Sequence, residues 1–129
     1  MDQDALVAGL KKLASDLEKK EGPLALLMLL APDLETNDAW NLIVSAHGFD
    51  RQSRGHAVKE VSALLRESVN ESEWSRIARA TVLRTDDPFV RAMNSAFRAE
   101  NSVINLQACN VFGIDIPRAV LLESKQVAA

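Results

Sequence analysis

Cysteine, tyrosine and glycine are scarce in this chain of 129 residues. Cys109 is the only cysteine, so one chain can form neither a disulfide nor a cysteine-based metal site. Its sequence neighbours offer no base, which favours a buried structural thiol over a nucleophile. The five glycines form no phosphate-binding loop, and the lack of tyrosine, with aromatics at 5%, leaves few platforms for stacking bases. We therefore expect neither a familiar nucleotide site nor nucleic-acid binding.

Long apolar runs are also missing. The longest, Pro23 to Pro32, has about half the length of a membrane-spanning helix. The residues Met1 to Asp4 are acidic, whereas a secretory signal begins with basic residues. We expect a cytoplasmic protein that does not bind a membrane.

The overall composition is that of an ordinary globular chain. Apolar residues make up 47% and charged residues 26% of the sequence, close to globular averages. The length fits one domain with a core large enough to fold without disulfides. No repeat or linker interrupts the chain, so we expect a single globular domain over residues 1–129, with a frayed tail at 125–129.

Apolar residues at helical spacing predict three longer helices and a short one. Asn70 with Glu73 resembles a capping box, so the short helix should begin there and end near Arg79. Asp87 before Pro88 is the clearest helix start, since Asp caps well and proline suits the first helical position. The longer helices are expected at Asp4–Lys20, Arg54–Ser68 and Pro88–Ala99.

Five further segments have strand character. Leu24–Leu30 is rich in helix formers, but two prolines limit it to strand length, so we predict a buried strand. Pro117 cannot donate to a ladder, which places the last strand at a bulge or a sheet edge. The other expected strands are Trp40–Ala46, Ala80–Arg84, Val103–Cys109 and Ile116–Ser124.

This element order predicts an α/β fold, with α+β as the alternative. The strands should form a single mixed sheet of about five strands, in which a helical crossover joins two β-hairpins. The first two strands are apolar at consecutive positions, so both faces of the sheet should be covered by helices.

The loops after Ala46 and Arg84 form the one candidate site. If the strands before them are parallel neighbours, both loops open on the same sheet edge and their polar residues converge. His47, Asp50 and Asp86 are the candidate catalytic residues, with no catalytic motif to support them. The candidate residues for binding an anion or a partner are Arg51, Arg54, Arg84, Arg91 and Arg98.

Most of these residues also have an ordinary explanation. Asp87 reads as a helix cap, Asp50 as a cap or turn residue, and His47 as a hydrogen-bonded loop residue. His47 and His56 lack the spacing of a metal-ligand pair, and Ser45 lacks the glycines of a nucleophile elbow. We therefore expect no metal and no cofactor.

Charge is unevenly distributed along the chain. The segment from Arg51 to Arg98 holds nine basic and six acidic residues, whereas the remainder holds six basic and twelve acidic ones. Arg91 and Arg98 should share one helical face, which could bind an acidic partner. The alternative is a solvated face in which Asp87 pairs with Arg91.

Two functions from different classes remain. We favour a small interaction or accessory protein that associates with itself or binds a larger protein partner, using exposed sheet edges and its charge contrast. The alternative is a small hydrolase acting on a phosphorylated or nucleotide-like substrate, with His47 as base and nearby arginines binding the anion.

Overall fold

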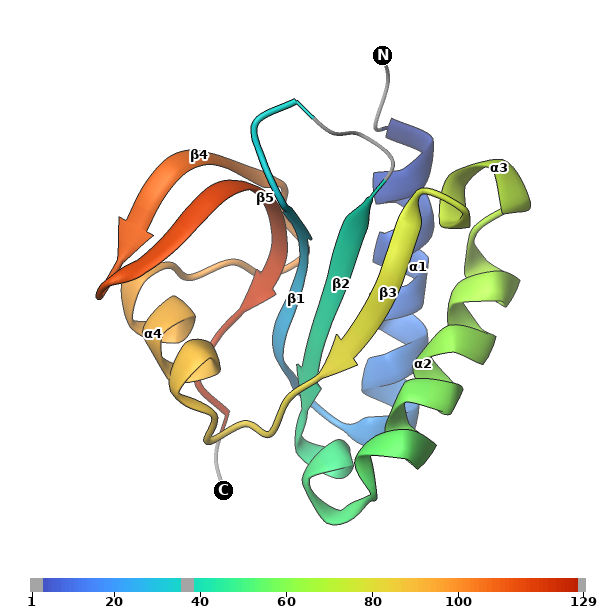
Figure 1. Cartoon of the computed structure of the whole chain (residues 1–129). Coiled ribbons are helices and arrows are strands. Elements are labelled where there is room, and N and C mark those ends of the chain that lie inside the picture. Colours follow the sequence, from blue (N-terminus) through green and yellow to red (C-terminus); the bar gives the residue numbers. More distant parts are fainter. Residues whose placement is uncertain (1–3, 36–38, 128–129) are drawn as a thin grey trace.

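The computed structural model describes residues 4–35 and 39–127 and shows an α+β fold with one mixed sheet (Figure 1). The chain begins with α1 (Asp4–Glu21), β1 (Leu24–Ala31) and β2 (Trp40–Ala46). A 3-10 turn, η1 (His47–Arg51), leads into α2 (Arg54–Ser68), α3 (Glu71–Trp74) and β3 (Ile77–Val82). The last elements are α4 (Pro88–Ala96), β4 (Ile104–Val111) and β5 (Ile114–Ser124).

The sheet has the order β3-β2-β1-β5-β4. β1 pairs antiparallel with both β2 and β5, and β4 pairs antiparallel with β5. β2 and β3 are parallel, and α2 and α3 form the crossover between them. The prediction of two hairpins and a helical crossover in one five-stranded mixed sheet is therefore confirmed.

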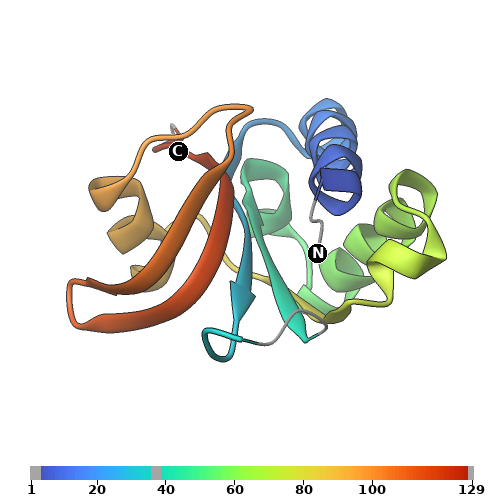
Figure 2. The same ribbon diagram turned by 90° about the horizontal axis from the view of Figure 1, so that it is seen from above.

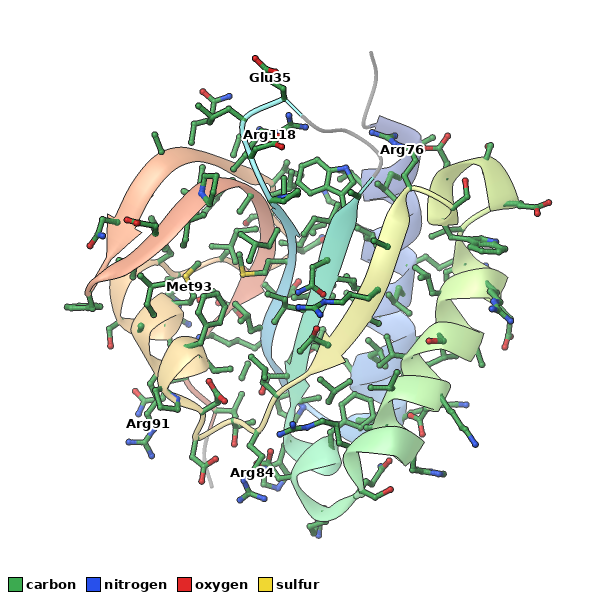
Figure 3. The ribbon with its side chains drawn as sticks, in the orientation of Figure 1. Glu35, Arg76, Arg84, Arg91, Met93 and Arg118 are labelled. Atoms are coloured by element: carbon green, nitrogen blue, oxygen red, sulfur yellow. The ribbon has the colours of Figure 1, made fainter. Side chains whose placement is uncertain are left out.

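Helices cover both faces of the sheet. The apolar faces of α1 and α2 pack on one face, against alternate β1 residues such as Leu27 and Leu29. Met93 of α4 packs on the other face with Met28 of β1, and Figure 3 shows Met93 pointing in from α4. Because β1 is central and buried on both faces, its run of apolar residues forms a strand although their propensity favours a helix.

Gly22 ends α1 and permits the close approach of β1. Its φ of 82° is a left-handed conformation that glycine adopts without strain, and its N–H donates to the Glu18 carbonyl at 3.1 Å. The predicted helix Asp4–Lys20 thus differs from α1 by one residue at this end. The sequence also offers Asp2 as an alternative cap of the first helix and Asn37 and Asp38 as part of a polar connector, and these three residues lie outside the described ones.

Three predicted boundaries in the middle of the chain are wrong. α3 ends at Trp74 rather than near Arg79, and β3 begins at Ile77 and ends before Arg84. Pairing with β2 decides this, because the Trp40 N–H donates to the Arg76 carbonyl at 3.0 Å and the parallel ladder begins there. Asn70 also makes no side-chain cap bond to the backbone of α3.

The C-terminal elements differ from expectation in length. α4 ends at Ala96, three residues before the predicted end, and the turn between β4 and β5 contains only Phe112 and Gly113. Pro117 lies inside β5 rather than at the start of that strand, and β5 runs between β1 and β4 rather than at an edge of the sheet. Cys109 is half-buried in β4, where a fully buried thiol was expected.

The β4–β5 hairpin curls over α4, away from α1 and α2 (Figures 1 and 2). The core-facing residues of β4 change from Ile104 and Leu106 to Cys109 and Val111. Ala108, with φ of 49°, and Pro117 of β5 lie at this change, between the pairs Gln107–Arg118 and Cys109–Ile116. The pairing register of β4 with β5 is the same on both sides of this point. The core-facing positions therefore shift by one residue in both strands at the same level. The β4 residues that pack toward α4 are Ile104, Leu106, Cys109 and Val111.

No helix in the described part of the chain has the length and apolar character needed to cross a membrane.

Candidate functional site

The carboxyl ends of β2 and β3 lie side by side, as the sequence analysis anticipated. The two strands are parallel, and the Leu83 N–H donates to the Val44 carbonyl at 2.9 Å just beyond β3. The loop after β2 and the loop after β3 are then joined directly. Thr85 donates its backbone N–H to Asp50 Oδ1 at 2.9 Å and its hydroxyl to Asp50 Oδ2.

These bonds give Asp50 a structural role. Both of its carboxylate oxygens accept hydrogen bonds from Thr85, which ties the loop after β2 to the loop after β3. Asp50 does not cap α2, because Ser53 Oγ accepts the His56 N–H at 3.2 Å and performs that function. Of the two structural roles predicted for Asp50, the helix cap is wrong; Asp50 lies in the turn η1, where it holds two loops together.

Arg84 completes the connection between the loops. Its Nη1 donates to the Asp50 carbonyl and its Nε to Asp86 Oδ1, both at 3.0 Å. The hydrogen bond from Arg84 to Asp86 holds the pKa of Asp86 below its usual range, and the charge of Arg91 contributes a smaller attraction. Arg54 lines a hollow of about 120 Å³ beside Arg84, whereas Arg51 is exposed and does not line it.

His47 lies on the opposite side of β2 from Arg84. Its N–H donates to the Pro23 carbonyl at 3.2 Å, so it lies against the start of β1 rather than against the loop after β3. Its Nδ1 is buried without a hydrogen-bond partner. The predicted catalytic set is thus divided, because the backbone of His47 bonds to the start of β1, whereas Asp86 bonds to Arg84 after β3.

A carboxyl pair that the sequence analysis did not identify joins α1 to α2. A hydrogen bond with Glu21 is the main cause that raises the pKa of Glu60 to about 7, with burial and the Glu21 charge adding to it. Gln52 of the loop before α2 donates to Glu21 Oε1 at 2.8 Å. Glu21 and Glu60 are far apart in the sequence and belong to no motif, so only the packing of the two helices reveals them.

Arg91 and Arg98 line a second hollow, which is open and has a volume of about 840 Å³. Arg98 pairs with Glu100 at 3.0 Å, and Arg91 makes no ion pair with Asp87, whose carboxylate caps α4 by accepting the Phe89 N–H at 2.8 Å. Arg84 and Arg91 point outward at the same end of the molecule (Figure 3). The other lining residues are Thr85, Asp86, Asn94, Ser95, Gln126 and Val127.

The edge strand β4 is the most unusual surface in the described part of the chain. No charged residue occurs between Glu100 and Asp115, although 26% of all residues are charged. Three large apolar side chains stand out as exposed, and two of them flank β4: Val103 is 44% and Phe112 74% exposed, and the third, Leu34, is 53% exposed. The uncharged run was visible in the sequence, but its place at a sheet edge was not.

The opposite edge of the sheet is protected. β3 forms that edge, and it carries the exposed Arg79 and follows Arg76. Charged residues at an edge discourage pairing with another strand, and β4 has none. The two edges of this sheet therefore differ in their capacity to bind another chain.

Within residues 4–35 and 39–127, no three His, Cys, Asp or Glu side chains come together in a way that could hold a metal ion. No family model matches the chain, and no curated protein or solved structure is significantly similar to it. Any assignment of function therefore depends on the geometry of these surfaces.

Proposed function

We propose that this protein is an interaction module that binds another protein chain along the β4 edge, with Phe112 as the main side-chain contact. The observation that carries the proposal is Phe112 itself. Its side chain is 74% exposed, and it is held in a left-handed backbone conformation with φ of 50°. Neither property benefits the isolated fold.

The backbone at the hairpin tip favours a different residue. Phe112 and Gly113 both have positive φ, the pattern of a two-residue hairpin turn in which Asn-Gly is strongly preferred. A bulky side chain in this conformation costs about 1–2 kcal/mol. Because Phe112 buries little surface in return, a binding role explains its presence better than packing does.

Hydrogen bonds from the side chain of Asn110 hold the turn that carries Phe112. Asn110 Oδ1 accepts the Gly113 N–H at 2.9 Å, and Asn110 Nδ2 donates to Asp115 Oδ1 at 2.8 Å. A rigid aromatic residue loses little conformational entropy when it binds, which is why such residues often dominate interfaces.

The β4 backbone supplies the second part of the surface. β5 pairs with one side of β4, and in the described structure the other side of the strand pairs with nothing. Its outward N–H and C=O groups can form a ladder with a partner strand, the mode of binding known as strand addition.

Substitution of Phe112 by Asn tests the proposal. The variant should gain about 1 kcal/mol in unfolding free energy, because Asn suits the turn, and should lose binding. The measurement is retention of proteins from an extract of the native cells by tagged wild-type and variant chains, with sedimentation velocity of each chain alone. Equal binding by a folded Phe112→Asn chain would contradict the proposal.

Leu34→Asn is the matched control. Leu34 is also an exposed apolar residue, but it lies in the loop after β1 and outside β4. This variant removes a similar amount of exposed apolar surface and should bind as the wild type does. If Leu34→Asn abolishes binding while Phe112→Asn does not, the binding surface lies elsewhere.

A further inference from the structure

We infer that the strand which pairs with β4 is β4 of a second copy of this chain, antiparallel to the first and related to it by a two-fold axis. This inference rests on the proposed function and specifies the partner. It predicts that two five-stranded sheets join edge to edge.

The phase change in β4 is the first argument for a second copy. At Ala108 the core-facing positions of β4 shift by one residue, and the core-facing positions of β5 shift likewise between Ile116 and Ala119. A partner strand on the outer side must carry a matching change at the same place, which a regular strand does not. β4 of another copy has that change because its sequence and backbone are the same.

The shift at Ala108 also allows two β4 strands to pair with their core-facing residues on the same face of the joint sheet. If Ile104 lies opposite Val111 of the second copy, then Leu106 lies opposite its Cys109. All four of these residues face the α4 side of the sheet, so residues on one face meet residues on the same face. A strand of uninterrupted alternation would not allow this register between two-fold-related copies, since opposite residues would then point to different faces.

The same register brings the exposed apolar residues together. Val103 and Phe112 immediately precede and follow β4, so each Phe112 lies opposite Val103 of the second copy. One pairing thus covers both exposed apolar residues of the segment twice, once at each end of the joint strand.

The charge distribution permits a second copy at this edge. Each chain carries a net charge of −3, so two copies repel each other at long range. The uncharged β4 is where this repulsion is smallest, and self-pairing there brings no like charges into contact. Eight residues span about 26 Å, a short contact that implies a concentration-dependent dimer.

A charge exchange close to the two-fold axis tests the inference. Gln107 and Ala108 are exposed at the middle of β4. The double variant Gln107→Lys/Ala108→Lys and the double variant Gln107→Glu/Ala108→Glu should each raise the dimer dissociation constant about tenfold or more, because like charges then face each other twice. An equimolar mixture of the two variants should restore dimers to nearly the wild-type level. Sedimentation equilibrium measures all four samples, and circular dichroism checks that each variant is folded.

The possible outcomes separate this inference from the proposed function. A wild-type dimer that neither double variant weakens, or a mixture that remains monomeric, overturns pairing between two β4 strands. A wild-type chain that stays monomeric at every concentration, while it retains a different protein through Phe112, overturns the second copy but leaves the interaction module standing. If Phe112→Asn leaves all binding intact, the proposed function itself fails.

Discussion

Asp50 shows how a residue that looks catalytic in the sequence can be a structural connector. Its two oxygens are taken by the backbone and side chain of Thr85, 35 positions further along the chain. Arg84 adds a third contact through the Asp50 carbonyl. The carboxylate thus fixes the relative position of the loops that follow β2 and β3.

Substitution of Asp50 by Ala should lower the unfolding free energy by about 2–3 kcal/mol, because hydrogen bonds to a charged, partly buried group are among the stronger ones. Asp86→Ala is the control, since the pair of Asp86 with Arg84 is exposed and screened by solvent, so its loss should lower the unfolding free energy much less. Urea denaturation of both variants measures the difference. Equal losses in the two variants would mean that Asp50 does not hold the loops together.

Residue roles that depend on near neighbours could be predicted, and those that depend on distant ones could not. The Asp87 cap and Pro88 at the first position of α4 follow from adjacent residues, and the structure confirms both. The contacts between Asp50 and Thr85 and between Glu21 and Glu60 cross long sequence separations. Only the assembled sheet and helices create them.

At the scale of elements, α1 and α2 are connected by a group that titrates near neutrality. The hydrogen bond with Glu21, then burial and the Glu21 charge, raise the pKa of Glu60 from 4.5 to about 7, while Lys20 opposes the change. The folded chain therefore binds more protons than the unfolded chain between these two pH values. Since the bound proton favours the folded state, this contribution is complete below pH 4.5 and is lost as the pH rises through about 7.

Glu60→Gln should remove this pH dependence. The amide can still donate a hydrogen bond to Glu21 but does not titrate, so the variant should gain stability over the wild type as the pH rises from about 4.5 to 7 and keep that gain above 7. Chemical denaturation at several pH values measures the difference. Glu67→Gln, at an exposed position of the same helix, should follow the wild-type curve. A difference between Glu60→Gln and wild type that does not change with pH would contradict the assignment.

The elements themselves were largely predictable where local and tertiary preferences agreed. β2 and α2 have the bounds that their periodicity indicates, Trp40–Ala46 and Arg54–Ser68. The error at α3 and β3 has a physical cause, because residues 77–79 have helix-compatible spacing but gain a parallel ladder with β2. Tertiary pairing exceeded a weak local preference there.

At the scale of the whole molecule, the strand topology follows from general rules, whereas the position of the uncharged β4 edge does not. A strand, a helical crossover and a second strand predict parallel neighbours, and the structure confirms that their following loops meet. The sequence could not show which strand lies at the edge of the sheet, because that depends on the strand order. It therefore could not show that the uncharged segment forms an unpaired edge. At the joined loops, the carboxylates of Asp50 and Asp86 already accept hydrogen bonds, and the binding surface that we propose lies at the opposite edge of the sheet.

Pairing between two molecules should make thermal stability depend on protein concentration. The melting temperature of the wild type should rise with concentration, because dimerisation stabilises only the folded chain. Phe112→Asn should melt about 3–4 °C above the wild type in dilute solution, where its better turn is the main difference, and should show no concentration dependence. The two curves should therefore converge as concentration increases, and differential scanning calorimetry over a wide concentration range measures them. Parallel curves would mean that the hairpin tip affects folding alone and that whole molecules do not associate through it.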